Sequence, residues 1–328
     1  MSMLRKIGFA LAATLLSVAG SAQAQRRADA GAVRQDRAPG EPVTFAGARQ
    51  YDMVSASTGR AYRIYLSIPA SPPPPAGYPV LFVTDGDTNF IPAAIQSRLQ
   101  VGEGVAPAVI VGIGYPDNDR LNRRNLDFTP PTPAEHVPPG LRDAWLNKQT
   151  SFGDAEPFFR FITQEVRPFV AAHARIDPAN QALFGHSLGG LFTVQTMLAH
   201  PGAFRSYIAS SPSLWWNDGE LLKSPAHARA MKQQRLLVTV GALEQSTDQL
   251  LLPIGHDRDV MIATIKLARM VDNARELVGS IPSDGGSGNV ALLEITPANF
   301  HAGNLSASIG RALRFAFSPP SDAGSAGK

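Results

Sequence analysis

Residues 181–194 read QALFGHSLGGLFTV, and this stretch decides which fold the chain adopts. Gln181–Phe184 is typical of a short buried strand, whereas the residues from Leu188 onward are typical of the start of a helix. Between them stands a Gly-x-Ser-x-Gly string centred on Ser187. A chain this rich in glycine and serine contains about 0.2 such strings by chance, so the flanking strand and helix carry the inference. They predict a nucleophile elbow, a sharp strand-to-helix turn that projects the Ser187 hydroxyl.

The two glycines of the string have a mechanical reason in such a turn. Gly185 and Gly189 remove Cβ atoms that would collide across it while Ser187 holds a strained backbone angle. The following helix points the positive end of its dipole at the serine oxygen, which favours negative charge developing there. The competing interpretation is a glycine-rich turn with an incidental serine.

The rest of the chain alternates strand-like and helix-like segments. Ala61–Ile68 alternates apolar and polar residues, as a half-buried antiparallel strand does. Later strands are apolar runs, which suit parallel strands covered on both faces; they are Tyr78–Val83, Ala106–Ile113, Ala182–Phe184, Tyr207–Ala209, Leu236–Val240 and Val290–Ile295. The predicted helices are Phe158–Ala172, Leu188–Ala199, Asp259–Val278 and Asn304–Phe317, with Asp154 and Asn304 as capping residues. This order predicts the α/β-hydrolase fold: a mostly parallel central sheet flanked by helices, with antiparallel N-terminal strands.

The general base should follow Ser187 in the chain, because this fold orders its catalytic residues as Ser, acid, His. Four histidines follow it: His200, His227, His256 and His301. His200 ends a predicted helix, His227 looks like a solvated helix position, and His256 stands in a loop at a helix start. His301 follows the last predicted strand across a short loop, at the carboxyl edge of the sheet where the elbow opens. We therefore predict His301 as the base, with His256 as its rival.

The acid and the oxyanion hole are predicted from position. Glu244 is the first carboxylate after the strand that precedes the last one, and it would hold the imidazole in one tautomer. Asp248, four residues further on, is the alternative. One oxyanion donor should be the backbone N–H of Leu188, the residue after the nucleophile. The other should come from the loop after the first apolar strand, where the candidates are Gly86 and Asp87.

The two ends of the chain read as segments outside the folded domain. Arg5 and Lys6 precede an apolar run of about 13 residues, too short to span a bilayer, and Ala22-Gln23-Ala24 fits a signal-peptide cleavage site. We expect a signal peptide at 1–24, a flexible leader at 25–40, a single catalytic domain at 41–317 and a disordered tail at 318–328. This layout predicts a periplasmic or secreted protein with no stable membrane insertion after cleavage.

Composition excludes several classes of function. The chain has no cysteine, which removes thiol catalysis and thiolate metal sites. The net charge is +3, and Arg5 and Lys6 of the expected signal peptide account for two of these charges. What remains lacks the basic patch that nucleic-acid binding requires. We expect neither a metal nor an organic cofactor, because a serine nucleophile needs only side chains around it.

Several motifs resemble the putative-esterase family of α/β hydrolases, which includes S-formylglutathione hydrolase, feruloyl esterase domains and the enterochelin esterases. The resemblance rests on the elbow together with TGRAYRI at 58–64, YPVLFVTDG at 78–86, VGIGYP at 111–116, RNLDFTP at 124–130 and SSPSLWW at 210–216. It covers residues 43–317. The similarity points most closely to the periplasmic siderophore-esterase branch.

The resemblance implies Ser187 as nucleophile and His301 as base. It leaves the acid open, because some siderophore esterases of this type are described as working with a Ser–His dyad. It also implies catecholate trilactone substrates, whose ferric forms are negatively charged. Arg120, Arg123 and Arg124 lie in the matching loop and would attract them; the alternative is a solvated loop face.

Three functions follow from these features. The leading one is hydrolysis of a small-molecule carboxylic ester, including a ferric siderophore, through an acyl-enzyme on Ser187. The second is removal of feruloyl or acetyl groups from carbohydrate, in which Trp215 and Trp216 would stack on sugar or aryl rings. The third is a non-catalytic periplasmic binding protein on the same scaffold. The presence of Ser187, His301 and a following acid argues against the third.

Overall fold

The computed structural model describes residues 44–116, 120–137, 152–223, 233–250, 257–282 and 288–319. The expected signal peptide and leader, together with His227 and His256, lie outside these ranges. So do most of the expected tail and the side chain of Arg120. The helices in the described ranges include none that is both long enough and apolar enough to cross a bilayer.

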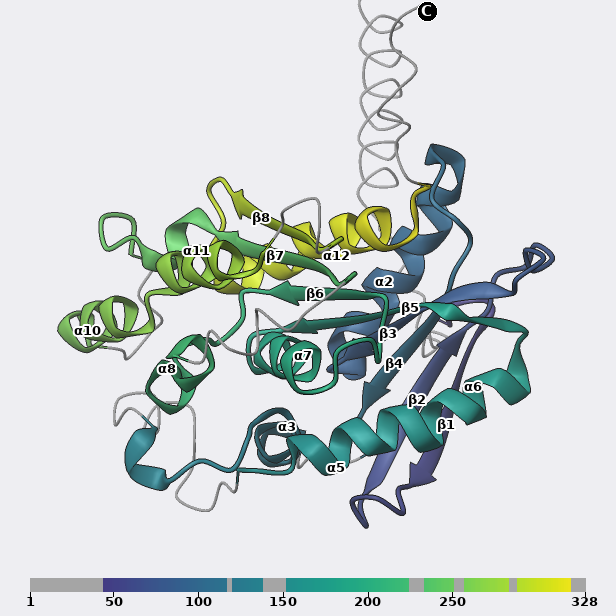
Figure 1. Ribbon diagram of the computed structural model, residues 1–328, viewed down its shortest axis with the longest axis horizontal. Helices are drawn as coiled ribbons and strands as arrows, with labels where there is room; N and C mark the ends of the chain where they lie inside the picture. The colour runs from purple at the N-terminus through teal and green to yellow at the C-terminus, as the bar shows by residue number, and fades with distance from the viewer. Residues whose placement is uncertain are drawn as a thin grey trace, which may run out of the picture. The chain divides into compact units, whose positions relative to one another are not determined.

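Within the described ranges, eight strands form one sheet in the order β1-β2-β4-β3-β5-β6-β7-β8 (Figure 1). The strands are β1 (Ala48–Val54), β2 (Ala61–Ser67), β3 (Tyr78–Thr84), β4 (Val109–Gly114), β5 (Ile176–His186), β6 (Ser206–Ser210), β7 (Arg235–Gly241) and β8 (Val290–Thr296). β1 pairs with β2 and β2 with β4 in antiparallel fashion, and all other pairs are parallel. The predicted α/β-hydrolase fold is confirmed.

The helical segments connect these strands. They are α2 (Gly86–Gln100), η1 (Val101–Glu103), α3 (Arg120–Phe128), η2 (Ala134–His136), α5 (Ala155–Arg160), η3 (Phe161–Val166), α6 (Arg167–His173), α7 (Leu188–Ala199), α8 (Trp216–Lys223), η4 (Ala242–Gln245), α10 (Arg258–Ala268), α11 (Met270–Ser280) and α12 (His301–Phe317). In Figure 1, α2 and α12 lie on one side of the sheet, and α5, α6 and α7 lie on the other. The segment η3 is a single stretch of wider π-helix that joins α5 to α6.

Strand β3 shows why the central strands read as continuous apolar runs. Every residue of Tyr78–Thr84 is buried. Val80 and Phe82 belong to the hydrophobic core beneath α5, α6, α7 and α11. Leu81 and Val83 point the other way, into the core beneath α2 and α12. Because successive side chains leave a strand on opposite faces, a strand covered twice needs apolar residues at every position.

The predicted helix Asp259–Val278 is wrong as a single element, because α10 ends and α11 begins at Arg269. Arg269 has left-handed backbone angles, φ 43° and ψ 42°. The Gln245 side chain of η4 explains the break, since its carbonyl oxygen accepts from the backbone N–H groups of Val271 and Asp272, at 2.9 Å each. It therefore satisfies the amides at the start of α11 that have no partner within the helix, a contact that periodicity along one helix does not reveal.

The predicted capping residues also have other partners. Asn304 lies inside α12, which begins three residues earlier, at His301. The Asn304 side chain is fully buried and donates to Ser211 Oγ at 2.8 Å. Asp154 does precede α5, but its carboxylate pairs with Arg60 at 2.6 Å and caps no backbone amide. In both cases a tertiary partner takes the side chain that the local pattern assigned to a helix end.

Gln245→Ala is expected to lower the free energy of unfolding by about 1–2 kcal/mol, because two amides at the start of α11 lose their acceptor. Urea denaturation followed by circular dichroism measures this change. Gln164→Ala, at an exposed position of η3, is the matched control and should stay within about 0.5 kcal/mol of the wild type. Equal stability of both variants would contradict the capping role of Gln245.

Candidate active site

Ser187 stands in a strained turn between β5 and α7. Its φ is 61° and its ψ is −120°, a conformation that L-residues rarely adopt. The turn closes tightly, because a Cβ on Gly185 would lie 2.0 Å from the carbonyl oxygen of Gly189. A Cβ on Gly189 would lie 2.5 Å from Thr84 Oγ1 at the end of β3. Gly185 is therefore required by a backbone contact and Gly189 by a contact with the Thr84 side chain, as the sequence predicted for a nucleophile elbow.

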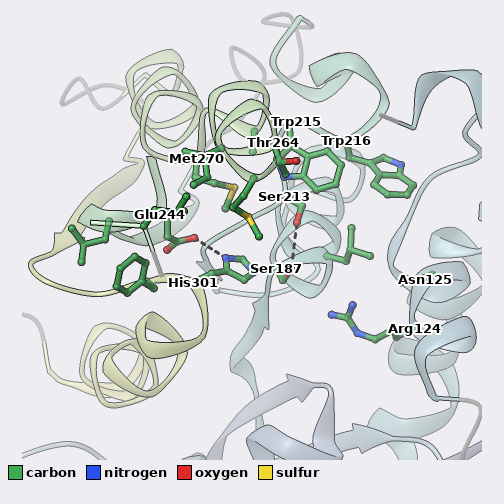
Figure 2. A pocket seen from close by; sticks show the side chains of 17 residues that line it. Arg124, Asn125, Ser187, Ser213, Trp215, Trp216, Glu244, Thr264, Met270 and His301 are labelled. Carbon is green, nitrogen blue, oxygen red and sulfur yellow. Dashed lines mark hydrogen bonds and ion pairs between the residues drawn. The ribbon is translucent and has the colours of Figure 1, made fainter. Parts of the chain in front are cut away.

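His301 and Glu244 meet beside this turn. His301 is the first residue of α12, and its Nδ1 lies 2.6 Å from Glu244 Oε2 in η4. With Nδ1–H donating to the carboxylate, the other ring nitrogen, Nε2, is left to face the pocket. Figure 2 shows the His301 ring next to Ser187, with Glu244 on its far side. The three side chains therefore stand in the order that a Ser–His–acid relay needs.

The Glu244 carboxylate is enclosed by protein and hydrogen-bonded on both oxygens. Its side chain is only 1% exposed. Oε1 accepts from Ser211 Oγ and from the backbone N–H of Gly241, both at 2.6 Å, while Oε2 faces His301. A buried carboxylate is tolerated only when hydrogen bonds replace its water shell. The arrangement fixes Glu244 from behind and leaves one oxygen for the imidazole.

The three residues open into a cavity of about 260 Å³. One side of it is apolar and comes from η4, α10 and the start of α11, and it includes Leu243, Met261, Ile265 and Met270. Trp215 and Trp216 add aromatic surface, and Arg124 and Asn125 of α3 lie opposite Glu244 (Figure 2). The cavity therefore joins an apolar wall to a polar one, with Ser187 between them.

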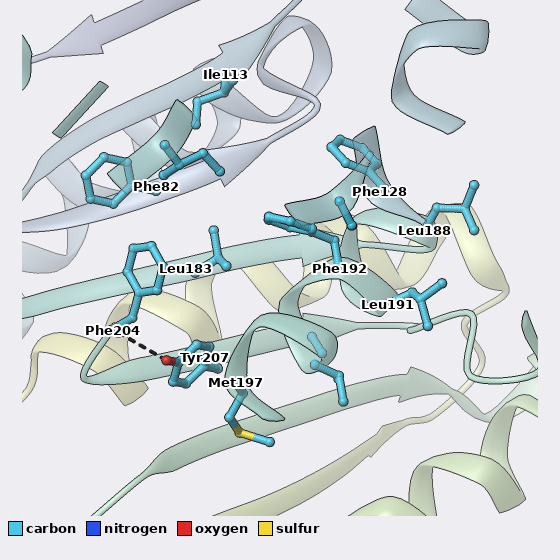
Figure 3. Packing of buried hydrophobic residues seen from close by; sticks show 14 of the residues in the cluster. Phe82, Ile113, Phe128, Leu183, Leu188, Leu191, Phe192, Met197, Phe204 and Tyr207 are labelled. Atoms are coloured by element: carbon cyan, nitrogen blue, oxygen red, sulfur yellow. Dashed lines mark hydrogen bonds between the residues drawn. The ribbon is translucent and has the colours of Figure 1, made fainter. Parts of the chain in front are cut away.

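Helix α7 is held firmly under the site. Leu188, Leu191 and Phe192 are buried in the core (Figure 3). The Phe192 ring lies 5.2 Å from that of Phe158 and 6.0 Å from that of Phe128. Because these rings come from α7, α5 and α3, the helix that begins at the elbow is locked to its neighbours. The backbone amides at its start are thus fixed before any substrate binds.

The three predicted arginines have different surroundings. Arg124 lines the cavity, but its guanidinium makes two hydrogen bonds to Asp85, at 2.8 and 3.0 Å. Arg123 is not among the lining residues and donates to the carbonyl oxygen of Ala61 in β2. The backbone of Arg120 begins α3, and its side chain lies outside the described residues. Of the described arginine side chains in this group, the structure brings Arg124 to the site, already paired with an acid.

Helix α3, which carries Arg124 and Asn125, is tied down by a buried carboxylate one turn further on. Asp127 is fully buried and accepts hydrogen bonds from Arg60, Tyr62 and Tyr115. Burial raises the pKa of Asp127 to about 6, and the neighbouring charge of Arg60 opposes that rise. These contacts hold the polar wall of the cavity in place.

Of the three residues predicted as oxyanion donors, one lies at the cavity. Leu188 lines it, whereas Gly86 and Asp87 are not among the lining residues. Gly86 packs on β4, since a Cβ there would lie 2.7 Å from the backbone of Gly112. The Asp87 carboxylate accepts from the Tyr65 hydroxyl at 3.1 Å and from the Tyr115 amide at 3.2 Å. The second donor stays a prediction.

The alternatives to His301 and Glu244 that the structure describes lie elsewhere. His200, at the end of α7, pairs with Glu156 at 2.7 Å and stacks on Phe159. Asp248 is exposed and does not line the cavity. The rival His256 falls outside the described ranges.

Sequence reasoning missed two side chains beside the reacting groups. Ser213 Oγ lies 3.4 Å from Ser187 Oγ and lines the same cavity. His186 lies with its ring 4.6 Å from that of His301. Burial, followed by the nearby charges of His301 and Arg124, holds the pKa of His186 well below its usual range, so it stays neutral at pH 7. Ser213 belonged to the SSPSLWW motif, but nothing in that motif shows that it faces the nucleophile.

The sheet order and the elbow define the class of the protein, an α/β hydrolase with its site at the carboxyl ends of parallel strands. Residues 55–257 match the family described as putative esterase. The chain is 37% identical over 288 residues to a ferri-bacillibactin esterase of Bacillus subtilis, covering 84% of this chain and 91% of that protein. It is 31% identical over 252 residues to a siderophore triacetylfusarinine C esterase of Aspergillus fumigatus, covering 73% of this chain and 81% of that one.

A solved structure gives the same result. A siderophore hydrolase from Aspergillus nidulans matches with a TM-score of 0.70 at 26% identity, covering 85% of this chain and 98% of the other. The chain belongs to the putative esterase family, as its motifs suggested. It is a carboxylic ester hydrolase.

Glu244→Gln is expected to lower kcat/KM for p-nitrophenyl butyrate about 100-fold or more, because the amide no longer stabilises a charged His301. Steady-state kinetics at pH 7 measures the change. Asp248→Asn removes an exposed carboxylate four residues away and should leave kcat/KM unaltered. Wild-type kinetics for Glu244→Gln would mean that the site works as a dyad.

Proposed function

We propose that the protein hydrolyses carboxylic esters of siderophores through an acyl-enzyme on Ser187. Ser187 Oγ attacks the ester carbonyl carbon, and His301 Nε2 accepts the hydroxyl proton. The C–O bond to the leaving alcohol then breaks, and the alcohol takes that proton from His301. Water, activated by the same imidazole, attacks the acyl-enzyme and releases the acid, which restores the Ser187 hydroxyl.

One observation carries this proposal: the hydrogen bond from His301 to a buried Glu244, beside a serine held at a positive φ in a sharp turn. Strained non-glycine residues cluster at active sites. Glu244 orients the ring and stabilises the imidazolium, and the Leu188 amide at the start of α7 supports negative charge on the carbonyl oxygen.

The substrate class is drawn from the relatives and from the shape of the cavity. The two curated relatives are named as esterases of ferri-bacillibactin and of triacetylfusarinine C. The cavity offers an apolar wall with Trp215 at its edge, which suits an aryl or other flat apolar acyl group. Arg124 and Asn125 on the other wall supply donors for the polar part of the ester. We infer a siderophore ester, with catecholate trilactones as the first candidates.

A carbohydrate-linked feruloyl or acetyl ester is the second candidate, and the position of Trp215 favours it. Trp215 lines the cavity and is partly exposed, so a sugar or an aryl ring has access to its face. Trp216 is less available, because it is 3% exposed and its indole N–H donates to Thr132 Oγ1 at 2.8 Å. Only one of the two tryptophans therefore serves as a stacking surface.

We further propose that the protein acts after export. The proposal rests on the positive residues, short apolar run and small-residue cleavage site at 1–24. N-terminal sequencing of the protein recovered from the periplasm or medium tests it, with a chain beginning at Gln25 as the expected result. Recovery of the full-length chain from the cytoplasm would contradict it.

Ser187→Ala is expected to abolish hydrolysis of p-nitrophenyl butyrate, with a loss of kcat of about 10⁴-fold or more, because no other group forms the acyl-enzyme. Labelling with a fluorophosphonate probe, read by intact-protein mass spectrometry, should be lost in the same variant. Circular dichroism checks that the variant is folded. Wild-type turnover or labelling by folded Ser187→Ala would exclude the assignment.

Among natural esters, a catecholate trilactone is expected to give a kcat/KM at least about tenfold above that of methyl ferulate. The larger substrate makes more contacts with the cavity, and contacts that are equally strong in the substrate complex and in the transition state lower KM. S-formylglutathione should be the poorest of the three. Product formation followed by liquid chromatography gives all three values. A preference for methyl ferulate would favour the carbohydrate-esterase function instead.

A further inference from the structure

A chain of hydrogen bonds lies behind the candidate acid and forms a ring with the backbone of α12. Ser211 Oγ donates to Glu244 Oε1 at 2.6 Å and accepts from Asn304 Nδ2 at 2.8 Å. Asn304 stands in α12 three residues after His301, whose Nδ1 meets the other Glu244 oxygen. The ring therefore runs from His301 through Glu244, Ser211 and Asn304, and the backbone of α12 closes it. Each member fixes the position of the next.

The backbone of Ser211 is strained in a way that points to a role for its side chain. Its φ is 43°, and the residue is completely buried. Its N–H donates to the carbonyl oxygen of Thr239 in β7 at 2.7 Å, which holds it in that conformation. Glycine adopts such angles with little cost, whereas serine does not. A serine at this position is therefore less favourable for the backbone than a glycine, but it provides a hydroxyl that donates to Glu244.

Asn304 determines which way the Ser211 hydroxyl points. The Asn304 amide nitrogen lies among three hydroxyl oxygens: Ser210 at 3.4 Å, Ser211 at 2.8 Å and Thr239 at 3.3 Å. An amide N–H₂ only donates, so Ser211 Oγ accepts from it and must send its own proton to the carboxylate. Ser211 thus donates to Glu244 Oε1, while His301 Nδ1–H donates to Oε2.

The hydroxyl groups around Asn304 also connect to the other side of the His301 ring. Ser210 Oγ lies 3.1 Å from His186 Nδ1, and the His186 ring packs on that of His301. Ser308 of α12 connects Ser210 at 2.9 Å with Thr239 at 2.6 Å. The imidazole is therefore supported from Glu244 on one side and from His186 on the other, through one buried group of hydroxyls. The charged or titratable groups that the described residues place around His301 are Glu244, His186 and Arg124.

We propose that Ser211 and Asn304 are positioning residues, which hold Glu244 in the orientation that aligns His301 with Ser187. The inference rests on the proposed Ser187 mechanism and assigns a role to two residues outside the Ser–His–acid set. It predicts that their loss slows turnover while substrate binding is kept, because neither side chain lines the cavity.

The test is Ser211→Gly, which removes the hydroxyl and relieves the backbone strain at once. We expect kcat for p-nitrophenyl butyrate to fall about tenfold, as for the loss of one hydrogen bond to a charged group, with KM unchanged. The melting temperature should stay equal to that of the wild type or rise. Ser211→Ala should show the same fall in kcat with a lower melting temperature, because alanine keeps the strain and also loses the hydroxyl's hydrogen bonds to Glu244 and Asn304. The downfield NMR signal of the His301 Nδ1 proton should shift in both variants.

Ser206→Ala is the matched control, a buried serine at the other end of β6 whose hydroxyl has no hydrogen-bond partner within the described residues. Its kcat and its Nδ1 signal should equal those of the wild type. Wild-type kcat in Ser211→Gly, alongside an inactive Ser187→Ala, would overturn the positioning role and leave the Ser187 mechanism standing. The positioning role would also be overturned if kcat fell only in the variants whose melting temperature falls and the His301 Nδ1 signal did not shift. Full activity of Ser187→Ala would overturn both proposals.

Discussion

The contact between Gly185 and Gly189 is the constraint on which the site depends. The chain turns from β5 into α7 so sharply that a single Cβ would penetrate a carbonyl oxygen. This turn forces Ser187 to a positive φ and presents its hydroxyl outside the sheet. The strain is sustained because β5 is hydrogen-bonded on both sides and α7 is packed against α3 and α5. A rigid scaffold thus holds a reactive side chain in an unfavourable conformation.

The parallel sheet gathers the remaining groups around that turn. Strands β5, β6, β7 and β8 are neighbours and run in one direction, so the segments that follow them meet at one edge. They supply Ser187, then Ser211 and Ser213, then Glu244, and finally His301. The apolar wall is added by α10 and α11, whose separation depends on Gln245, the neighbour of Glu244 in η4. The reacting groups and the wall of the cavity therefore share one short segment.

Charges near the site are buried only where several hydrogen bonds meet them. Glu244 accepts on both oxygens, Arg124 is paired with Asp85, and Asp127 is surrounded by an arginine and two tyrosines. Removing a charge from water is costly unless such partners replace the solvent. Arg124 therefore contributes less net positive charge to the cavity than its sequence position suggested, because a neighbouring carboxylate already balances it.

The sequence by itself predicted the fold and the elbow, and it favoured His301 and Glu244 as base and acid over His256 and Asp248, because each prediction depends on local signals. Apolar runs mark doubly covered strands, glycine marks a turn that excludes Cβ atoms, and the order of strands sends successive loops to the same edge. Only the tertiary structure decided the partners of Asp154, Asn304 and Gln245, the pairing of Arg124 with Asp85, and the closeness of Ser213 and His186 to the reacting groups. These contacts join residues that are distant in the chain or that face one another across a turn. The periodicity of a single segment does not show which polar side chains face each other across the fold, so these pairs are determined by tertiary packing alone.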